Sequence, residues 1–199
     1  AESLIARAHE LGLRVLIDLV PNHTSDEHPW FQAALAAGPH SPERAWYHFR
    51  DPDPTAPDAP PNDWCSVFGG GAWSRTPDGQ WYLHLFDAKQ PDLNWEHPPV
   101  RRAFEEIFRF WLARGVDGFR IDVAHGMVKA AGLPDVGLSR DKLQRGALPT
   151  HTAPYFDQPE VHEIARSWRR LLDAAAGERV LVAEAWVRPP ERLAQYLRP

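Results

Sequence analysis

Apolar residues recur at helical spacing in three stretches of the chain, and each stretch leads through a glycine into a short apolar run. The apolar stripes span Leu4 to Leu11, Val100 to Leu112 and Val161 to Leu172, and the glycines are Gly12, Gly115 and Gly177. A stripe of this period predicts an amphipathic helix, and glycine is a common helix stop. The short apolar run that follows predicts a strand buried on both faces of a parallel sheet.

Each of the three predicted strands ends at or beside an acidic residue, namely Asp18, Asp122 or Glu184. Helices and strands in alternation predict an α/β fold, either a doubly wound sheet or a (β/α)8 barrel. Both architectures build their active sites at the carboxyl ends of the strands. Three carboxylates in equivalent positions therefore favour a functional role over a purely structural one.

The second strand carries the most informative pair of side chains. Phe119 and Ile121 alternate with Arg120 and Asp122, and residues two apart on a strand share a face. A neighbouring guanidinium lowers the pKa of a carboxylate and keeps it ionised, as a carboxylate nucleophile requires. The alternative is an ordinary buried Arg–Asp ion pair.

Residues 24–96 interrupt the alternation of helices and strands. They are rich in proline and glycine, with short strand candidates at Trp46–Arg50 and Trp81–Phe86. A loop this long predicts a functional insertion or a small domain of its own, set between two parts of the main domain, 1–23 and 97–199. A second long loop, 124–158, contains His125, which either lines the same pocket as Asp122 or caps the following helix.

Composition narrows the class of protein. The chain has 199 residues, a net charge of −5 and a single cysteine, Cys65, which gives no basic footprint for nucleic acid and excludes an internal disulfide. No apolar run approaches the roughly 20 residues of a membrane span. We therefore expect a cytoplasmic protein with neither nucleic-acid nor membrane partners; the oligomeric state stays open. Three strand–helix units are too few to close a barrel of about 250 residues, which predicts an internal piece of a larger protein.

Four motifs resemble the α-amylase superfamily of glycoside hydrolases (family 13). Three are the run from Asp18 to His23 (Asp-Leu-Val-Pro-Asn-His), the run from Gly118 to Asp122 (Gly-Phe-Arg-Ile-Asp), and Glu184 after its apolar strand. The fourth, Gln90 to Asn94 (Gln-Pro-Asp-Leu-Asn), resembles the signature of the oligo-1,6-glucosidase and α-glucosidase subfamily. The resemblance implies a partial TIM barrel, about its third to fifth strands, with an irregular subdomain inserted after the third strand.

The resemblance also implies a retaining mechanism on short malto- or isomalto-oligosaccharides. Asp122 is the implied nucleophile, and Glu184 the acid/base, whose pKa the apolar residues before it are expected to raise. The resemblance places Asp18, His23, Arg120, Val123 and His125 at the substrate, with Asp18 supporting Arg120. Valine after the nucleophile goes with α-1,6 bonds in the family, whereas His125 departs from the usual asparagine-containing sequence.

Several alternatives stay open at this point. Transglycosylating relatives of the trehalose synthase, sucrose isomerase or amylosucrase type share both carboxylates, and an amino-acid transporter heavy chain shares the fold but loses them. Asn22 occupies a position that ligates calcium in many amylases. The α-glucosidase-like subfamily often lacks that calcium site. We therefore expect no cofactor, with calcium as the alternative. Asp18, Asn22 and His23 alone make a weak metal site. The family's third acidic residue lies beyond residue 199, so this chain alone is expected to be inactive.

Overall fold

The computed structural model describes residues 1–137 and 153–197. Two compact units make up the chain. The first contains residues 1–21, 98–125 and 159–199, and the second contains residues 22–97 and 126–158.

The first unit is built on a parallel sheet of three strands in the order β1-β5-β6. The strands are β1 (Leu16–Leu19), β5 (Gly118–Ile121) and β6 (Val180–Ala183). In this register Asp18 lies opposite Arg120, and Arg120 lies opposite Val182. The predicted α/β class with parallel strands is confirmed, and the carboxyl ends of all three strands lie at one edge of the sheet.

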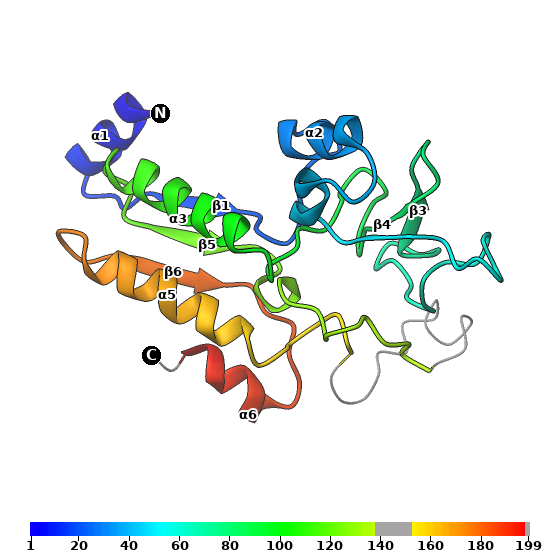
Figure 1. The fold of residues 1–199 in the computed structure, drawn as a ribbon. Helices are drawn as coiled ribbons and strands as arrows, with labels where there is room; N and C mark the ends of the chain where they lie inside the picture. Colours follow the sequence, from blue (N-terminus) through cyan, green and yellow to red (C-terminus); the bar gives the residue numbers. More distant parts are fainter. Residues whose placement is uncertain (138–152, 198–199) are drawn as a thin grey trace. The chain divides into compact units, whose positions relative to one another are not determined.

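Five helical segments accompany this sheet: α1 (Glu2–Glu10), α3 (Pro98–Leu112), α5 (Val161–Asp173), α6 (Pro190–Leu193) and the 3-10 turn η3 (Ala194–Leu197). Helices α3 and α5 run along the sheet (Figure 1). Phe108 of α3 packs edge-on against Phe119 of β5, with ring centroids 4.4 Å apart, and contacts Trp168 of α5 at 5.0 Å. The predicted stripes supply Val100 and Phe104 of α3 and Trp168 of α5 to the core of this unit, and Phe108, which was not in the predicted stripe, packs with them.

Glycine is required where β5 begins. A Cβ atom on Gly118 would lie 2.1 Å from the backbone oxygen of Val180 on β6, so any side chain here would separate the two strands. The glycines that follow α1, α3 and α5 all adopt positive φ angles, 72° at Gly12, 91° at Gly115 and 81° at Gly177. This is the left-handed conformation that ends a helix.

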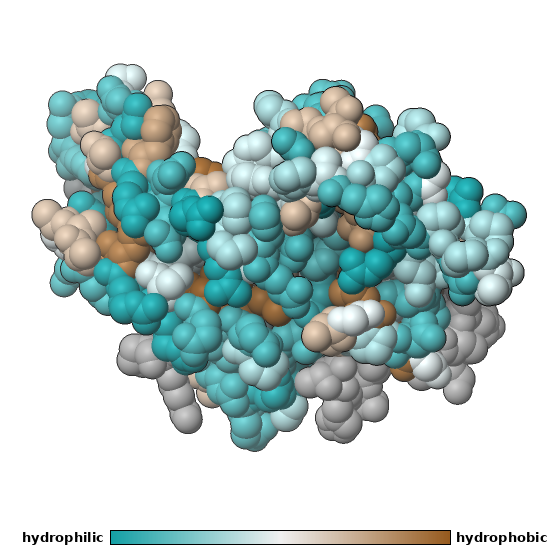
Figure 2. Space-filling model, viewed as in Figure 1, coloured by the Kyte–Doolittle hydropathy of each residue, from teal (hydrophilic) through white to brown (hydrophobic). Residues whose placement is uncertain are grey.

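In this three-stranded sheet the central strand is the most buried, with Phe119 and Ile121 buried and Arg120 partly exposed, whereas β1 and β6 are its outer strands. Leu16 is 41% exposed, and Val180 and Val182 are 48% and 46% exposed. Both strands lie at an edge of a three-stranded sheet, where packing covers one side less than the other. Hydrophobic surface is visible in Figure 2 over the part of the first unit where α1, β1 and α3 lie.

Asp117 ties the amino-terminal ends of these strands together. Its buried carboxylate accepts hydrogen bonds from the backbone N–H of Val15 at 2.7 Å and from Arg14 at 3.0 Å, and it contacts His9 at 2.8 Å. Burial opposes ionisation of this carboxyl group, but the donors outweigh it and lower its pKa to about 2. The ionised form therefore stabilises the fold.

Replacing Asp117 with asparagine is expected to lower the free energy of unfolding near neutral pH by about 2 kcal/mol. A depressed pKa contributes stability above the unfolded value and loses it as pH falls toward the folded value of about 2. Urea unfolding at neutral pH and at about pH 3 tests this, because the gap between wild type and Asp117→Asn should shrink in acid. The exposed Asp173→Asn is the control, and a gap independent of pH would contradict the assignment.

The second unit contains an antiparallel sheet in the order β2-β4-β3. Its elements are helix α2 (Pro29–Ala37), the 3-10 turn η1 (Pro42–Trp46), and strands β2 (Phe49–Arg50), β3 (Trp73–Arg75) and β4 (Trp81–Leu83). Its apolar core is formed by Trp64, Ala72, Trp73, Leu83, Leu85, Leu133, Ala153 and Tyr155. The strands predicted at 46–50 and 81–86 are both present but shorter, as β2 and β4, and Trp46 lies in the 3-10 turn η1.

Helix α2 was not predicted from the sequence. Its boundaries are conventional: the side chain of His28 accepts a hydrogen bond from the backbone N–H of Trp30 at 3.2 Å, Pro29 opens the first turn, and Gly38 follows at a φ of 79°. Proline at the first turn and glycine after the last are helix signals. These two residues did not stand out as helix boundaries, because proline and glycine are frequent throughout this region.

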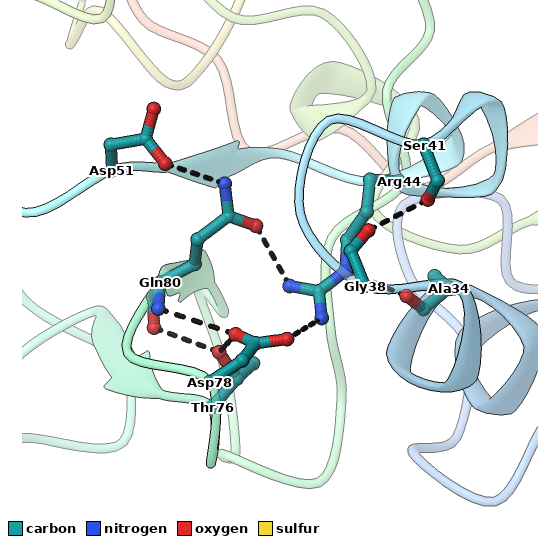
Figure 3. A network of polar contacts seen from close by, with 8 residues as sticks. All are labelled: Ala34, Gly38, Ser41, Arg44, Asp51, Thr76, Asp78 and Gln80. Atoms are coloured by element: carbon teal, nitrogen blue, oxygen red, sulfur yellow. Dashed lines mark hydrogen bonds and ion pairs between the residues drawn. The ribbon is translucent and has the colours of Figure 1, made fainter.

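A buried arginine fixes α2 to the small sheet (Figure 3). Arg44 donates to the backbone oxygen of Ala34 at 2.6 Å and to Gln80 at 2.8 Å, and it pairs with Asp78. Its guanidinium also lies over the ring of Phe49, 4.3 Å from the centroid. A buried charge with this many partners is satisfied, and we assign it a structural role.

Residues 126–137, assigned from the sequence to the main domain, pack with the second unit. Asn62 donates to the backbone oxygen of Leu133 at 3.0 Å, and Asp63 accepts from the backbone N–H groups of Val136 and Gly137. Residues 138–152 of the same loop lie outside the described residues. No helix in the described part of the chain has the length and apolar content needed to cross a membrane.

Candidate active site

One arginine joins three carboxylates at the carboxyl end of the parallel sheet. Nη1 of Arg120 lies 2.8 and 2.7 Å from the two oxygens of Asp18 and 3.0 Å from Oδ1 of Asp122. Nη2 of the same guanidinium lies 3.2 Å from Oε2 of Glu184. The three strand-end acids predicted from the sequence are therefore brought together around Arg120.

Backbone hydrogen bonds continue past the strand ends and hold these side chains. The N–H of Asp122 donates to Leu19 at 2.8 Å, and the N–H of Glu184 donates to Ile121 at 2.9 Å. Val123, which is buried, has a φ of 47°, a conformation that a β-branched residue rarely adopts. This turn aims the N–H of Val123 at Oε2 of Glu184, 3.2 Å away.

The two candidate catalytic carboxyls have opposite pKa shifts. Burial raises the pKa of Asp122, and the neighbouring Glu184 raises it further against the opposing effect of Arg120. The pKa of Glu184 is lowered by the hydrogen bond from Trp186, then by the backbone N–H of Val123. The expectation that apolar neighbours raise the pKa of Glu184 is therefore wrong in this structure, because Val182 and Ala183 are exposed and donors surround the carboxylate.

Trp186 is a site residue that the sequence analysis did not single out. Its indole Nε1 donates to Oε1 of Glu184 at 2.9 Å, although 78% of the residue is exposed. The available signal was its position two residues after Glu184, beyond the end of β6, in a chain with nine tryptophans. Tryptophan is otherwise read first as a core residue, as Trp168 is here.

His125 lies in a short 3-10 turn, η2 (Ala124–Gly126), directly after the nucleophile candidate. It is only 5% exposed. Both roles expected for it, lining the pocket of Asp122 or capping the following helix, stay predictions.

Asn22 and His23 belong to the second unit, where they meet the Gln90–Asn94 motif. The ring nitrogens of His23 lie 3.2 Å from the side-chain nitrogen of Asn22 and 3.0 Å from that of Gln90. Asn22 donates to the carboxylate of Asp92 at 3.1 Å. Burial lowers the pKa of His23 and so favours a neutral imidazole near neutral pH.

A buried lysine completes this group and was not anticipated. Lys129, with a side chain 1% exposed, lies 2.7 Å from Oδ2 of Asp92 and donates to Oδ1 of Asn22 at 2.9 Å. Its ammonium also donates to the backbone oxygen of Gly126. Asp92 is fully buried and accepts from the backbone N–H of Leu85 at 2.9 Å.

These contacts bear on the calcium alternative at Asn22. The side-chain oxygen that would ligate calcium accepts a hydrogen bond from a protein ammonium group, and the nearby carboxylate is neutralised by the same group. Calcium requires six to eight oxygen ligands, and a cation in the same place would be repelled by Lys129. Within the described residues, no group of three or more His, Cys, Asp or Glu side chains is placed to hold a metal ion. The residues at Asn22 therefore do not fit calcium.

The geometry at Arg120 is suited to acid–base and nucleophilic chemistry on one substrate atom. Asp122 and Glu184 come from adjacent strand ends and contact the same guanidinium, so both carboxyls reach a common space. Two carboxyl groups in one site are the usual apparatus of glycoside cleavage, but the pKa shifts here run against the expected roles, because Asp122 has the raised pKa and Glu184 the lowered one. The positive charge of Arg120 reduces the electrostatic repulsion between the two neighbouring carboxyl groups of Asp122 and Glu184.

The sequence is similar to glycoside hydrolases of the alpha-amylase family. The catalytic-domain model of alpha amylase matches residues 1–199. An oligo-1,6-glucosidase of Parageobacillus thermoglucosidasius is 42% identical over 171 residues, which covers 85% of this chain and 29% of that protein. Glucan 1,6-alpha-glucosidase of Streptococcus dysgalactiae subsp. equisimilis is 37% identical and covers 100% of the chain.

The solved structures agree with the sequence relatives. Trehalose-6-phosphate hydrolase of Bacillus licheniformis superimposes with a TM-score of 0.84 at 36% identity, covering 100% of this chain and 33% of that one. The chain thus spans about a third of the length of the relatives it matches. Those structures identify the parallel strands and helices of the first unit as a fragment of a TIM barrel. With a family model matching along its whole length, the chain belongs to the alpha-amylase family.

Proposed function

We propose that the protein carrying this chain is a retaining α-glucoside hydrolase that acts on short malto- or isomalto-oligosaccharides. The observation that carries the proposal is the single guanidinium of Arg120 in contact with both Asp122 and Glu184 at neighbouring strand ends. The oligo-1,6-glucosidases and the glucan 1,6-alpha-glucosidase among its relatives support the reaction class.

In this proposal Asp122 attacks the anomeric carbon and forms a glucosyl-enzyme ester. Glu184 gives a proton to the departing glycosidic oxygen and then removes one from the attacking water. Asp18 holds Arg120 by two contacts, and Arg120 stabilises the ionised nucleophile. Val123 positions Glu184 through its backbone N–H, and His23 binds the sugar as the family resemblance implies.

The placement of the chain in the barrel is part of the proposal. We assign β1, β5 and β6 to about the third, fourth and fifth barrel strands, with residues 24–96 as a subdomain inserted after the third strand. The parallel order β1-β5-β6 and the separate antiparallel sheet of the second unit support this assignment. Because Lys129 neutralises the Asn22 and Asp92 group, the proposed enzyme uses no calcium there.

Retention and bond preference are tested together by following the first product with proton NMR. The protein, incubated with isomaltose or maltose, should release α-glucose before mutarotation equilibrates the anomers. Val123 and the relatives that carry 1,6-glucosidase in their names favour a higher kcat/KM for isomaltose. Initial release of β-glucose would contradict the retaining mechanism, and a preference for maltose would contradict only the bond assignment.

Glucosyl transfer is the second candidate function, because one structural relative is named as an alpha-glucosyl transfer enzyme, XgtA, with a TM-score of 0.81 at 39% identity. The trehalulose synthase MutB superimposes with a TM-score of 0.83 at 33% identity. Hydrolysis and transfer share the glucosyl-enzyme and differ in the acceptor. Product analysis in concentrated sucrose or maltose separates them: free glucose supports hydrolysis, and a new disaccharide supports transfer.

A further inference from the structure

We propose that Trp186 controls the acid/base Glu184 from the leaving-group side. Its indole N–H donates to Oε1 of Glu184 in the free enzyme. When the departing sugar stacks on the exposed indole ring, this hydrogen bond breaks and the glycosidic oxygen takes the place of the indole N–H at Oε1. The inference rests on the proposed function above and adds a positioning and specificity role to it. It stands on the hydrogen bond between Trp186 and Glu184 and on the exposure of the ring.

The two oxygens of Glu184 have different surroundings. Oε2 faces the guanidinium of Arg120 at 3.2 Å and the backbone N–H of Val123 at 3.2 Å. Oε1 accepts the indole N–H of Trp186 at 2.9 Å. Because a cation and a fixed backbone donor occupy Oε2, the transferable proton belongs on Oε1. Trp186 therefore contacts the oxygen that performs the chemistry.

The hydrogen bond from Trp186 favours the wrong protonation state for the first step. An N–H donor stabilises the carboxylate, whereas the first step needs the carboxylic acid. The carboxylate is the form needed in the second step, when water is activated. A donor that leaves Oε1 when substrate arrives and returns after bond cleavage serves both steps.

Trp186 is built for such an exchange. The ring is 78% exposed, and the adjoining Val187 is buried and anchors the chain behind it. An indole presents a flat apolar face and a single polar edge, so it stacks on the apolar face of a pyranose while its N–H points to a polar group. The acid/base donates to the glycosidic oxygen, so a platform beside it is on the side of the departing sugar.

The proton balance of the two steps follows from these contacts. With Trp186 moved onto the sugar, protonated Oε1 transfers its proton to the glycosidic oxygen while the anomeric C–O bond breaks and an oxygen of Asp122 bonds to that carbon. Glu184 is then a carboxylate, which the indole N–H stabilises again. Water gives a proton to Oε1 and its oxygen to the anomeric carbon, and the ester bond to Asp122 breaks.

Two substitutions separate the functions of the side chain. Trp186→Phe removes the N–H and keeps a flat ring, whereas Trp186→Ala removes both. Trp111→Phe, in the half-buried part of α3, is the matched control for loss of an indole. All variants are made in the full protein, with isomaltose and maltose as substrates. α-Glucosyl fluoride is the comparison substrate, because its departing fluoride needs no proton from Glu184 and is not a sugar that could stack on Trp186.

Trp186→Phe should move the basic limb of the kcat/KM profile upward by about half to one pH unit, because the acid loses a donor that favoured its ionised form. The N–H of Val123, the contact with Asp122 and the charge of Arg120 also favour that ionised form, and burial opposes it; all of these are unchanged in the variant. Trp186→Ala should raise KM for the disaccharide about tenfold, with a smaller loss for α-glucosyl fluoride.

A basic limb that stays in place in Trp186→Phe, or equal losses for disaccharide and fluoride in Trp186→Ala, would overturn the inference. Either outcome leaves the proposed function intact if the unchanged protein still forms a glucosyl ester on Asp122. Absence of that ester in the unchanged protein would instead remove the basis of both.

Discussion

Replacing Asp122 with asparagine is expected to lower kcat/KM for α-glucosides by at least about 10⁴-fold. Asparagine keeps the shape of the side chain but supplies no anionic oxygen to form the glucosyl ester. Asp122 lies 3.0 Å from Arg120 and comes directly after the buried strand β5, so the substitution alters the reacting group with little change in packing. Initial rates on isomaltose and maltose measure the effect.

The control for this substitution is Asp173→Asn, at an exposed carboxylate on α5 that pairs only with Arg169 in the described structure. It should retain wild-type rates. Circular dichroism and the unfolding midpoint of Asp122→Asn establish that the loss is chemical. A folded variant with activity within about tenfold of wild type would exclude Asp122 as the nucleophile.

Replacing Lys129 with methionine is expected to lower the free energy of unfolding by about 3–5 kcal/mol, the usual cost of removing one member of a buried ion pair. The ammonium and Asp92 are both buried and lie 2.7 Å apart, so the variant leaves a carboxylate with no counter-ion in the core of the second unit. Burial lowers the pKa of Lys129, and Asp92 opposes that shift. Denaturant unfolding of the full protein measures the loss.

Two further variants make this prediction specific to charge. Lys129→Met combined with Asp92→Asn removes both charges and should recover a large part of the lost stability. Lys89→Met, at an exposed lysine of the same unit, should change the free energy of unfolding by less than about 0.5 kcal/mol. A double variant as unstable as Lys129→Met would mean that the lysine acts through its hydrogen bonds to Asn22 and Gly126 and not through its charge.

The parts of the fold that could be predicted from sequence are those with a strong local pattern. The predicted stripes of α3 and α5 bury Val100, Phe104 and Trp168; the buried Phe108 was not part of the predicted stripe. In α1 the same period was present, but Leu4 and Leu11 are exposed and only Ile5 is buried. Periodicity shows which face of a helix is apolar and does not show how much of that face is covered.

The carboxylate cluster was predictable for a geometric reason. Parallel strands end at the same edge of a sheet, so strand-final acids at Asp18, Asp122 and Glu184 converge if the strands are neighbours. The order β1-β5-β6 makes them neighbours. The protonation preferences were not predictable in this way, because they depend on which donors reach each oxygen.

Lys129 and Trp186 show what the sequence left hidden. Lys129 stands in a run of small and apolar residues, and nothing local indicates that its partner is Asp92, far away in the chain. Trp186 follows a predicted strand by a few residues, where a loop conformation decides whether an indole meets a carboxylate. Contacts between distant loops require the tertiary structure.

The most direct test of the central claim is to trap the covalent intermediate. The full protein is incubated with 5-fluoro-α-glucosyl fluoride, which slows hydrolysis of the ester more than its formation, and is then weighed intact and mapped by peptide mass spectrometry. One fluoroglucosyl adduct is expected, located on Asp122 and absent from Asp122→Asn. A folded, full-length protein that acquires no adduct, or acquires it on another residue, would contradict the assignment of Asp122 as the nucleophile.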